Sequence, residues 1–484
     1  MDREPFDPLA YRDPRPSPAL IRSLEPLNQR FLLPWVMRVR EIDLPAADEQ
    51  RLRAAVRPDT AAFLGPNHPE FLTDWLIDKE LSRRVAPRMA HWAEREIVNR
   101  SSWEQSFWLA NNLIANVPGG GGKEYSVQWA MAGNGVLLHP EGQPTWHPGH
   151  VDPLLPGIVD MAWDTVEALE RASRNVPVYL VPIVWWLRFT QDAAEGLHRE
   201  MAHFEQALSL GSGQGMSLEK RFEALMWGIL QHRCEAFGFM GPAGKSVLSP
   251  SDYFQAQTAL ADLLMEILGT RFGAQSGDLD AQLQGFRRAI RIQWEENPLS
   301  VHNDRKRLKE IERLRHFSRA LYDKETLLQE EIAACLKQLR GVLLPNEVVR
   351  NMVPIAVAPR IAHVRVLEPI EVHQRVAAAD GDAEAARASL LAELRTRMQA
   401  ALDLLGEELS ARRAPRRHPN PLWSRIGNHK GRLAGDDEAA LETPQGMPDS
   451  VEIESRPQLD RSGQADLMEP RQQDTVDRGR HSSS

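Results

Sequence analysis

A histidine and two acids lie within residues 67–74, close enough along the chain to act on a single hydroxyl group. His68 has the chemistry of a general base, because an imidazole with a pKa of about 6.5 is neutral near pH 7 and accepts a proton. An acid that accepts a hydrogen bond from the other ring nitrogen would fix the required tautomer. Asp74 is the first choice for this acid, and Glu70 is the alternative. The pattern predicts activation of a hydroxyl group as a nucleophile.

The local sequence around His68 predicts how the histidine is held. Residues 61–65 form a short apolar run that ends in Pro66 and Asn67, which is typical of a buried strand entering a turn. Pro69 suits the first position of a helix. We therefore expect His68 at a junction between a strand and a helix.

Two later segments add groups that could contact a substrate. An apolar run at residues 136–138 leads through His139 into Pro140-Glu141-Gly142, where the glycine permits a sharp turn and a close approach of the backbone. Glu141 and nearby backbone amides could then face a substrate. A third apolar run, residues 176–184, predicts a further buried strand.

The chain resembles the glycerolipid acyltransferase family, which includes bacterial lysophosphatidate acyltransferases. The resemblance rests on three segments in this order: the Asn67-His68 block with its following acid, the Pro140-Glu141-Gly142 block and the apolar run 176–184. The resemblance implies transfer of a fatty acyl group from acyl-CoA or acyl carrier protein to the hydroxyl of a lysophospholipid or similar lipid-like alcohol. It implies His68 as general base with Asp74, a substrate-binding role for Asn67, Glu141 and Gly142, and no cofactor.

The chain also departs from the family pattern. Five residues separate His68 from Asp74, where four are usual, and Gln143-Pro144 follows Gly142 where a threonine and an arginine are usual. Lys123, after a run of four glycines, is the candidate substitute cation for a phosphate. These departures keep open a rival interpretation, a non-catalytic lipid-binding or scaffold protein that retains the fold. A third interpretation is that the helical part binds a protein partner.

Histidines 139, 147 and 150 lie near Asp152 in the sequence, but no helical register holds them together, so we predict no metal site. The net charge of −9 and the pI near 6.0 argue against a nucleic-acid partner. Cys234 and Cys335 fall in apolar, helix-like segments, which predicts buried thiols. A cytoplasmic protein is expected, because the N-terminus lacks the pattern of a signal peptide.

Membrane contact is expected to be peripheral, on the inner face of the plasma membrane. The longest apolar run, residues 176–187, is too short to span a bilayer and contains two prolines. Arginines and lysines surround Trp423, and such a cluster can attract an anionic leaflet. A solvated linker is the alternative. The cluster comprises Arg412, Arg413, Arg416, Arg417, Arg425, Lys430 and Arg432.

Alternating strand-like and helix-like segments predict an α/β fold, an acyltransferase-like mixed sheet flanked by helices, with a helical insertion and a disordered C-terminal tail. The strand-like segment 360–370 would complete the sheet, and the polar tail would bury too little surface to order. The predicted parts are an N-terminal lead-in (1–55), an α/β core (56–192 and 355–375), a helical insertion (193–354), a C-terminal helix (381–411) and the tail (412–484).

Overall fold

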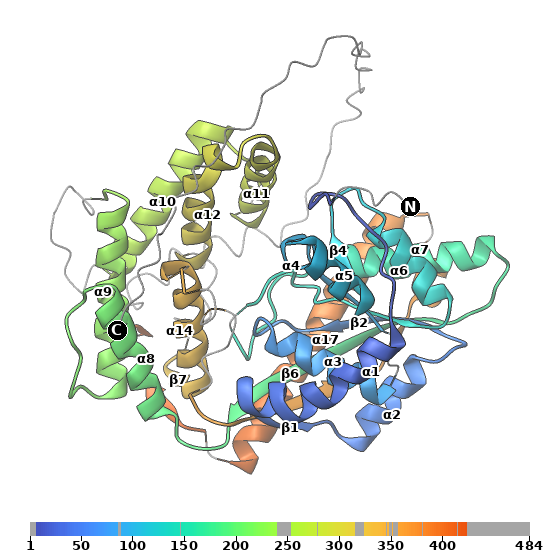
Figure 1. Ribbon diagram of the computed structural model, residues 1–484, viewed down its shortest axis with the longest axis horizontal. Helices are drawn as coiled ribbons and strands as arrows, with labels where there is room; N and C mark the ends of the chain where they lie inside the picture. Colours follow the sequence, from blue (N-terminus) through green and yellow to red (C-terminus); the bar gives the residue numbers. More distant parts are fainter. Residues whose placement is uncertain are drawn as a thin grey trace, which may run out of the picture. The chain divides into compact units, whose positions relative to one another are not determined.

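The computed structural model describes most of the chain up to Trp423, and all structural statements below concern this part (Figure 1). The described ranges are 6–85, 89–145, 147–239, 253–277, 279–314, 324–344, 346–347, 351, 357–379, 381–413 and 415–423. The predicted tail from residue 424 onward lies outside them.

A mixed sheet of eight strands organises the α/β part. The strands are β1 (Val39–Asp43), β2 (Ala61–Pro66), β3 (Ala90–Glu94), β4 (Leu113–Asn116), β5 (Gly135–Leu137), β6 (Val178–Phe189), β8 (Arg360–Val366) and β9 (Ile370–Glu371). Their order is β1-β8-β6-β2-β5-β3-β4, and β9 pairs with β6. Neighbours from β6 to β4 run parallel, whereas β8 is antiparallel to β6 and carries β1 parallel to itself. The predicted α/β class and mixed sheet are thus confirmed.

The central strand β2 shows why its sequence is an unbroken apolar run. All six of its residues are buried, because helices cover both faces of the sheet and parallel strands so covered carry apolar side chains on both sides. On one face, Leu76 and Ile77 of a helix pack against Leu64. On the other face, Phe63 packs in a cluster with Leu394.

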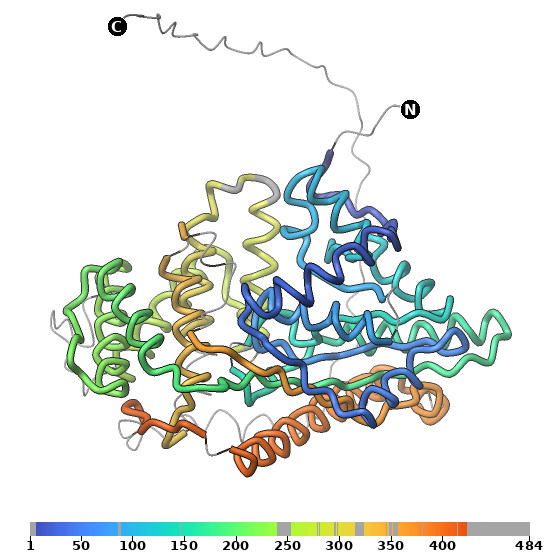
Figure 2. Tube along the Cα trace, turned by 60° about the horizontal axis from the view of Figure 1, so that its bottom comes forward, coloured from blue at the N-terminus to red at the C-terminus, as the bar shows by residue number. Residues whose placement is uncertain are grey.

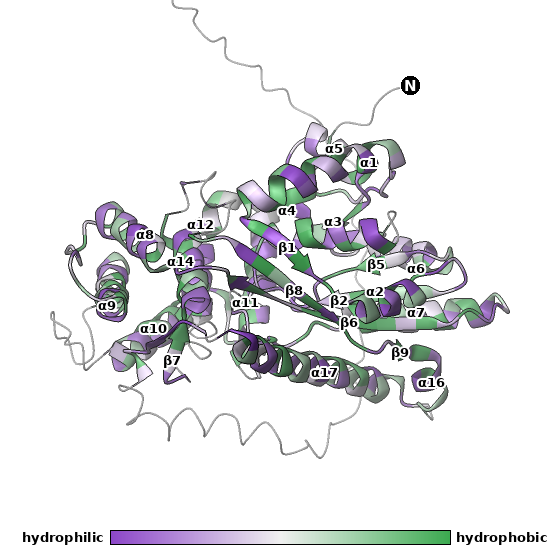
Figure 3. Cartoon of the chain, turned by 90° about the horizontal axis from the view of Figure 1, so that it is seen from below, coloured by the Kyte–Doolittle hydropathy of each residue, from purple (hydrophilic) through white to green (hydrophobic). Residues whose placement is uncertain are grey.

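The helices that surround the sheet come from both ends of the chain. Before β6 they are α1 (Pro18–Leu27), the π-helix η1 (Asn28–Val36), α2 (Ala46–Ala55), α3 (Thr73–Val85), α4 (Arg95–Val98), α5 (Ser102–Ala110), α6 (Gly122–Met131) and α7 (Gly157–Arg171). After β8 come α16 (Val372–Ala377) and the long α17 (Ala383–Arg412). Figure 3 shows α17 along one side of the sheet and α3 on the opposite side. The predicted C-terminal helix is confirmed, with its leucine stripe buried against the sheet.

Between β6 and β8 the chain is mainly helical and has its own apolar core, which includes Phe204, Phe222, Leu264, Phe286 and Leu336. Figure 2 shows these green and yellow helices grouped together. They are α8 (Ala194–Ala207), α9 (Leu218–Ala236), α10 (Tyr253–Phe272), α11 (Leu279–Glu296), the 3-10 helix η4 (Pro298–Val301), α12 (His302–Glu312) and α14 (Gln329–Leu343). Both cysteines are free and buried, as expected.

Two boundaries need correction. The N-terminal lead-in is part of the sheet, because β1 pairs with β8 along residues 39–43. A short strand, β10 (Arg417–Pro419), pairs with β7 (Thr326–Leu328) of the helical part, so the start of the segment predicted to be disordered is ordered. Both errors concern short strands whose partners lie far away in the sequence, which local pattern cannot reveal.

Candidate active site

Asn67 follows the last residue of strand β2 and is hydrogen-bonded to Trp185 of strand β6. Its side-chain oxygen accepts a hydrogen bond from the backbone N–H of Trp185 at 2.8 Å, and its side-chain nitrogen donates to the carbonyl of Trp185 at 3.2 Å. The indole N–H of Trp185 donates to the backbone carbonyl of Asn67 at 3.0 Å. These bonds use both polar atoms of the Asn67 side chain, which was predicted to contact substrate. Asn67 instead holds the backbone next to His68 in place.

The helix after His68 starts later than predicted. It begins at Thr73 and not at Pro69, because Leu72 has a φ of 68° and this left-handed conformation interrupts a helix. Residues 68–72 therefore form a loop, which accommodates the extra residue between His68 and Asp74. Asp74 lies in the first turn of α3, where the aligned peptide dipoles favour a negative charge.

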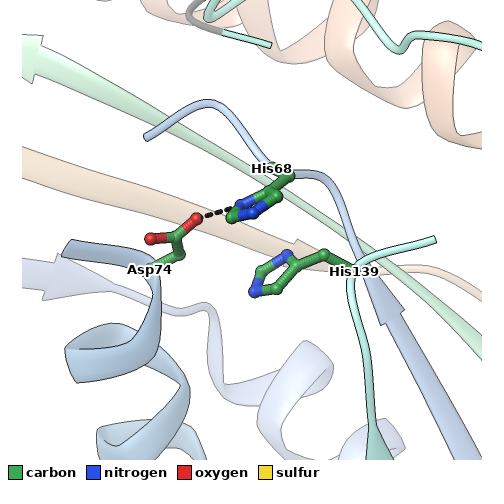
Figure 4. Close-up of side chains that lie close together, drawn as sticks. All are labelled: His68, Asp74 and His139. Atoms are coloured by element: carbon green, nitrogen blue, oxygen red, sulfur yellow. Dashed lines mark hydrogen bonds and ion pairs between the residues drawn. The ribbon is translucent and has the colours of Figure 1, made fainter. Parts of the chain in front are cut away.

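The structure brings His68 and Asp74 together (Figure 4). The Nδ1 atom of His68 bonds the Oδ2 atom of Asp74, whose side chain is 2% exposed. Among the described residues, no hydrogen-bond partner contacts Nε2 of His68, and the side chain is 15% exposed. Because an ionised Asp74 can only accept, Nδ1 carries the proton and Nε2 presents a lone pair.

Glu70, the alternative acid, is engaged elsewhere. Its carboxylate accepts hydrogen bonds from the guanidinium of Arg360 and, at 2.8 Å, from the hydroxyl of Thr73. Arg360 itself is buried on β8 and also donates to the carbonyl of Met37. Glu70 thus links the loop to strand β8, and Asp74 is the acid that contacts His68.

A second histidine lies directly against the first. The rings of His68 and His139 stack with centroids 4.2 Å apart and an angle of 17° between their planes (Figure 4). Nδ1 of His139 lies 3.0 Å from the carbonyl oxygen of Asn67, and Nε2 lies 3.0 Å from a carboxylate oxygen of Asp78. The carbonyl oxygen can only accept, so Nδ1 donates, and an imidazolium would also donate from Nε2 to Asp78.

The electrostatics of the two histidines differ. Burial lowers the pKa of His139, but Asp78 and then Asp74 outweigh burial and raise this pKa to about 9. For His68, burial is the largest cause and lowers the pKa; Asp74 opposes this, and the charge on His139 lowers it further. Burial also raises the pKa of Asp78, which opposes the charged pair, but the raised pKa of His139 favours a proton on the ring. Near pH 7, His139 is charged and His68 is neutral.

The side chains of His68, Asp74 and His139 are better suited to hydrogen bonding than to binding a metal ion. Ligand atoms of His68, Asp74 and His139 lie within 4.8 Å of one another, which is close enough to surround an ion. Zinc and related metals bind imidazole through a free lone pair, however, and both nitrogens of His139 already point at oxygen acceptors. The chemistry of these contacts fits an acid–base pair beside a fixed cation.

The Pro140-Glu141-Gly142 block supports the loop that carries His68. The carboxylate of Glu141 accepts hydrogen bonds from the backbone N–H of His68 at 2.6 Å and from that of Asp152 at 2.7 Å. Burial raises the pKa of Glu141 to about 8, and these two backbone bonds act in the opposite direction. Gly142 has a φ of 73°, and a Cβ there would lie 2.4 Å from Leu155. The block positions His68; contact with an acceptor stays a prediction.

Lys123 lies in the first turn of α6, which contacts α7 and strand β2. Its ammonium group forms an ion pair with Asp160 at 3.2 Å. The role of Lys123 as a substitute phosphate cation therefore receives no support from this geometry.

A cavity of about 350 Å³ opens beside the His68 loop. Phe71 and Thr145 line it on the side of the α/β part, and Thr145 donates its backbone N–H to the carbonyl of His68 at 2.8 Å. Lys309 and Lys337 line it from the helical part. The volume falls in the range of sites for small ligands. His68, Asp74 and His139 are not among the lining residues, so the cavity is a candidate binding site that adjoins the His68 loop.

Sequence reasoning did not find the second histidine–aspartate pair. Asp78 follows Asp74 by four residues on α3, and this spacing places both carboxylates on one helix face. His139 stands where the resembled family has an aromatic residue, and a position in a loop by itself favours a histidine with purely structural contacts. Two features of the sequence could have indicated this pair: the spacing of Asp74 and Asp78 on one helix face, and a histidine at position 139 in place of an aromatic residue.

The charge difference between the two rings predicts distinct titrations. We expect NMR of the histidine side chains to show His68 titrating below pH 6.5 and His139 near pH 9, since Asp78 stabilises the His139 cation and burial destabilises a charge on His68. His68→Ala and His139→Phe variants would assign the two resonances. An ordinary titration of His139 near 6.5 would contradict its assignment as a cation.

Comparison with known proteins gives no independent identification: no protein-family model matches the chain, and no curated protein matches it.

Proposed function

We propose that the protein is an O-acyltransferase that moves a fatty acyl group from an acyl thioester, acyl-CoA or acyl carrier protein, to the hydroxyl of a lysophospholipid or similar lipid-like alcohol. The observation that carries this proposal is the His68–Asp74 pair, with a buried carboxylate on Nδ1 and a lone pair on Nε2. The resemblance of the surrounding motifs to the glycerolipid acyltransferases supports the substrate class.

In the proposed reaction, Nε2 of His68 removes the proton from the acceptor hydroxyl as its oxygen attacks the thioester carbonyl. The carbon–oxygen bond forms, the carbon–sulfur bond breaks, and the leaving thiolate takes the proton from His68. An ester and a free thiol result. Asp74 stabilises the imidazolium that exists between the two proton transfers.

His139 sets the balance of this proton transfer. The His139 ring is stacked on His68, and its positive charge lowers the pKa of His68. His68 therefore stays neutral in the resting protein and can accept a proton. The same charge makes the transient His68 imidazolium a stronger acid, which favours return of the proton to the leaving sulfur. Asp74 and Asp78 limit the repulsion between the two rings.

We further propose that the protein works in the cytoplasm at the inner face of the plasma membrane. Within the described residues, no helix has both the length and the low polarity needed to cross a bilayer. Basic side chains after α17 would supply peripheral attraction to anionic lipids, although Arg412 pairs with Asp43 and Glu408 and Arg416 lies 3.9 Å from Asp192. Arg425, Lys430 and Arg432 lie outside the described residues.

One observation favours the rival function, a lipid-binding or scaffold protein without catalysis. Each oxygen of the Glu141 carboxylate accepts a hydrogen bond from a backbone N–H group, which gives Glu141 a structural role where contact with an acceptor was predicted. Binding and turnover therefore have to be measured separately.

The purified protein would be mixed with a labelled acyl thioester and either lysophosphatidate or an uncharged monoacylglycerol. We expect ester and free thiol to form in equal amounts with at least one acceptor. Binding of both lipids, with no thiol release above the background hydrolysis of the thioester, would establish the rival function and exclude the enzyme.

A further inference from the structure

The cavity beside the His68 loop is built by two parts of the chain that are far apart in sequence. One wall belongs to the α/β part and consists of Phe71, Gln143, Pro144, Thr145, His147, His150 and Asp152. The other wall consists of residues from α12 and α14, the helices that precede β8. The helical part therefore completes a site next to the loop that carries the proposed base.

Cationic side chains of the helical part gather on this second wall. They are Lys309, Arg313 and Lys337. Two acids, Asp152 and Glu312, also line the cavity. Arg287 lies 2.8 Å from Glu312. His150 lies 3.6 Å from Asp152, but burial lowers the pKa of His150, so this imidazole does not neutralise Asp152 near pH 7.

Lys309 and Lys337 are the two lysines of this wall, and Arg313 forms an ion pair with Glu310 at 2.6 Å. Lys309 is exposed near the end of α12. Lys337 is buried on α14 and donates a hydrogen bond to the backbone carbonyl of Asn351. Burial, together with the neighbouring Arg340, lowers the pKa of Lys337 to about 7. A bound anion would oppose both effects and stabilise the charged amine.

We propose that this cavity binds a phosphate group of a substrate, with Lys309 and Lys337 as its cations. Phosphate fits because it carries up to two negative charges and three acceptor oxygens, which several converging donors can satisfy at once. Either the phosphate of a lysophospholipid acceptor or a phosphate of the acyl donor could supply it. This inference rests on the proposed function, since it places the phosphate of one substrate next to the loop that carries His68.

Equilibrium binding and kinetics would test the site in the full-length protein with the variants Lys309→Gln, Lys337→Met and the double replacement. We expect the double variant to bind lysophosphatidate or acyl-CoA at least roughly tenfold more weakly, the usual scale for lost charge-assisted hydrogen bonds. Its KM for the same compound should rise similarly, with little change in kcat. Uncharged monoacylglycerol and acyl-pantetheine, which lack these phosphates, should be unaffected, and the comparison identifies which substrate supplies the group.

Lys306→Gln is the matched control, because Lys306 is an exposed residue of α12 that does not line the cavity. Thermal unfolding would verify that each variant folds, and the exposed Lys309→Gln keeps the test usable if replacement of buried Lys337 disturbs packing. Unchanged binding of both phosphate compounds to folded variants would overturn the site. Binding that depends on the lysines without turnover in the wild type would overturn only the acyltransferase proposal.

Discussion

Replacement of His68 by alanine is expected to lower the rate of acyl transfer by about 10² to 10⁴-fold, the usual contribution of a positioned general base. The physical reason is that Nε2 of His68 is the atom that receives the hydroxyl proton, while Asp74 holds Nδ1. The side chain is only partly buried, so the fold should survive. Initial rates with saturating thioester and acceptor would measure the effect.

His302→Ala is a suitable control for this experiment, because His302 is an exposed histidine at the start of α12. It should retain the wild-type rate. If folded His68→Ala protein turns over at the wild-type rate, His68 is not the base and the proposed mechanism is wrong.

The parts of the fold that sequence could predict are those whose signal is local. Residues 61–65 predicted a buried strand because a central parallel strand is apolar throughout, and the leucine spacing predicted α17 because one face of that helix packs on the sheet. The pairing of β1 with β8 joins residues more than three hundred positions apart, and no local pattern encodes it.

The same distinction applies to the candidate site. The short spacing between His68 and Asp74 could suggest their contact, since both belong to one loop and the helix that follows. Stacking of His139 on His68 could not be predicted, because it requires β5 to lie beside β2 in the sheet. The cavity could not be predicted either, because its cationic wall comes from α12 and α14, which lie far from the His68 loop in the sequence.

The start of α3 shows how one backbone conformation decides which acid is used. Had the helix begun at Pro69, the loop would have been shorter and Asp74 would lie further along the helix. Leu72 in the left-handed region delays the helix to Thr73, and Asp74 then lies in the first turn. Glu70 meanwhile faces Arg360. The choice between the two acids therefore depends on backbone geometry, which residue counting alone could not resolve.

Replacement of Asp74 by asparagine should lower kcat by about 10² to 10⁴-fold, and the upper end is the scale seen when an amide replaces the aspartate of a catalytic histidine. The nitrogen of the new side-chain amide can donate to Nδ1 of His68, which would move the ring proton to Nε2. The base would then hold a proton on the atom that must accept one. Because aspartate and asparagine have nearly the same shape, KM should change little.

Glu70→Gln is the matched control for Asp74→Asn, since it makes the same chemical change in the other nearby acid. We expect Glu70→Gln to retain most of kcat, because Glu70 bonds Arg360 and Thr73 and not His68. NMR of the His68 ring would report the tautomer directly: Nδ1 should be protonated in the wild type and in Glu70→Gln, and Nε2 in Asp74→Asn. A larger loss of kcat in Glu70→Gln, with the His68 tautomer changed there, would transfer the orienting role to Glu70. An unchanged tautomer and rate in Asp74→Asn would show that the contact between His68 and Asp74 supports structure and does not direct the proton.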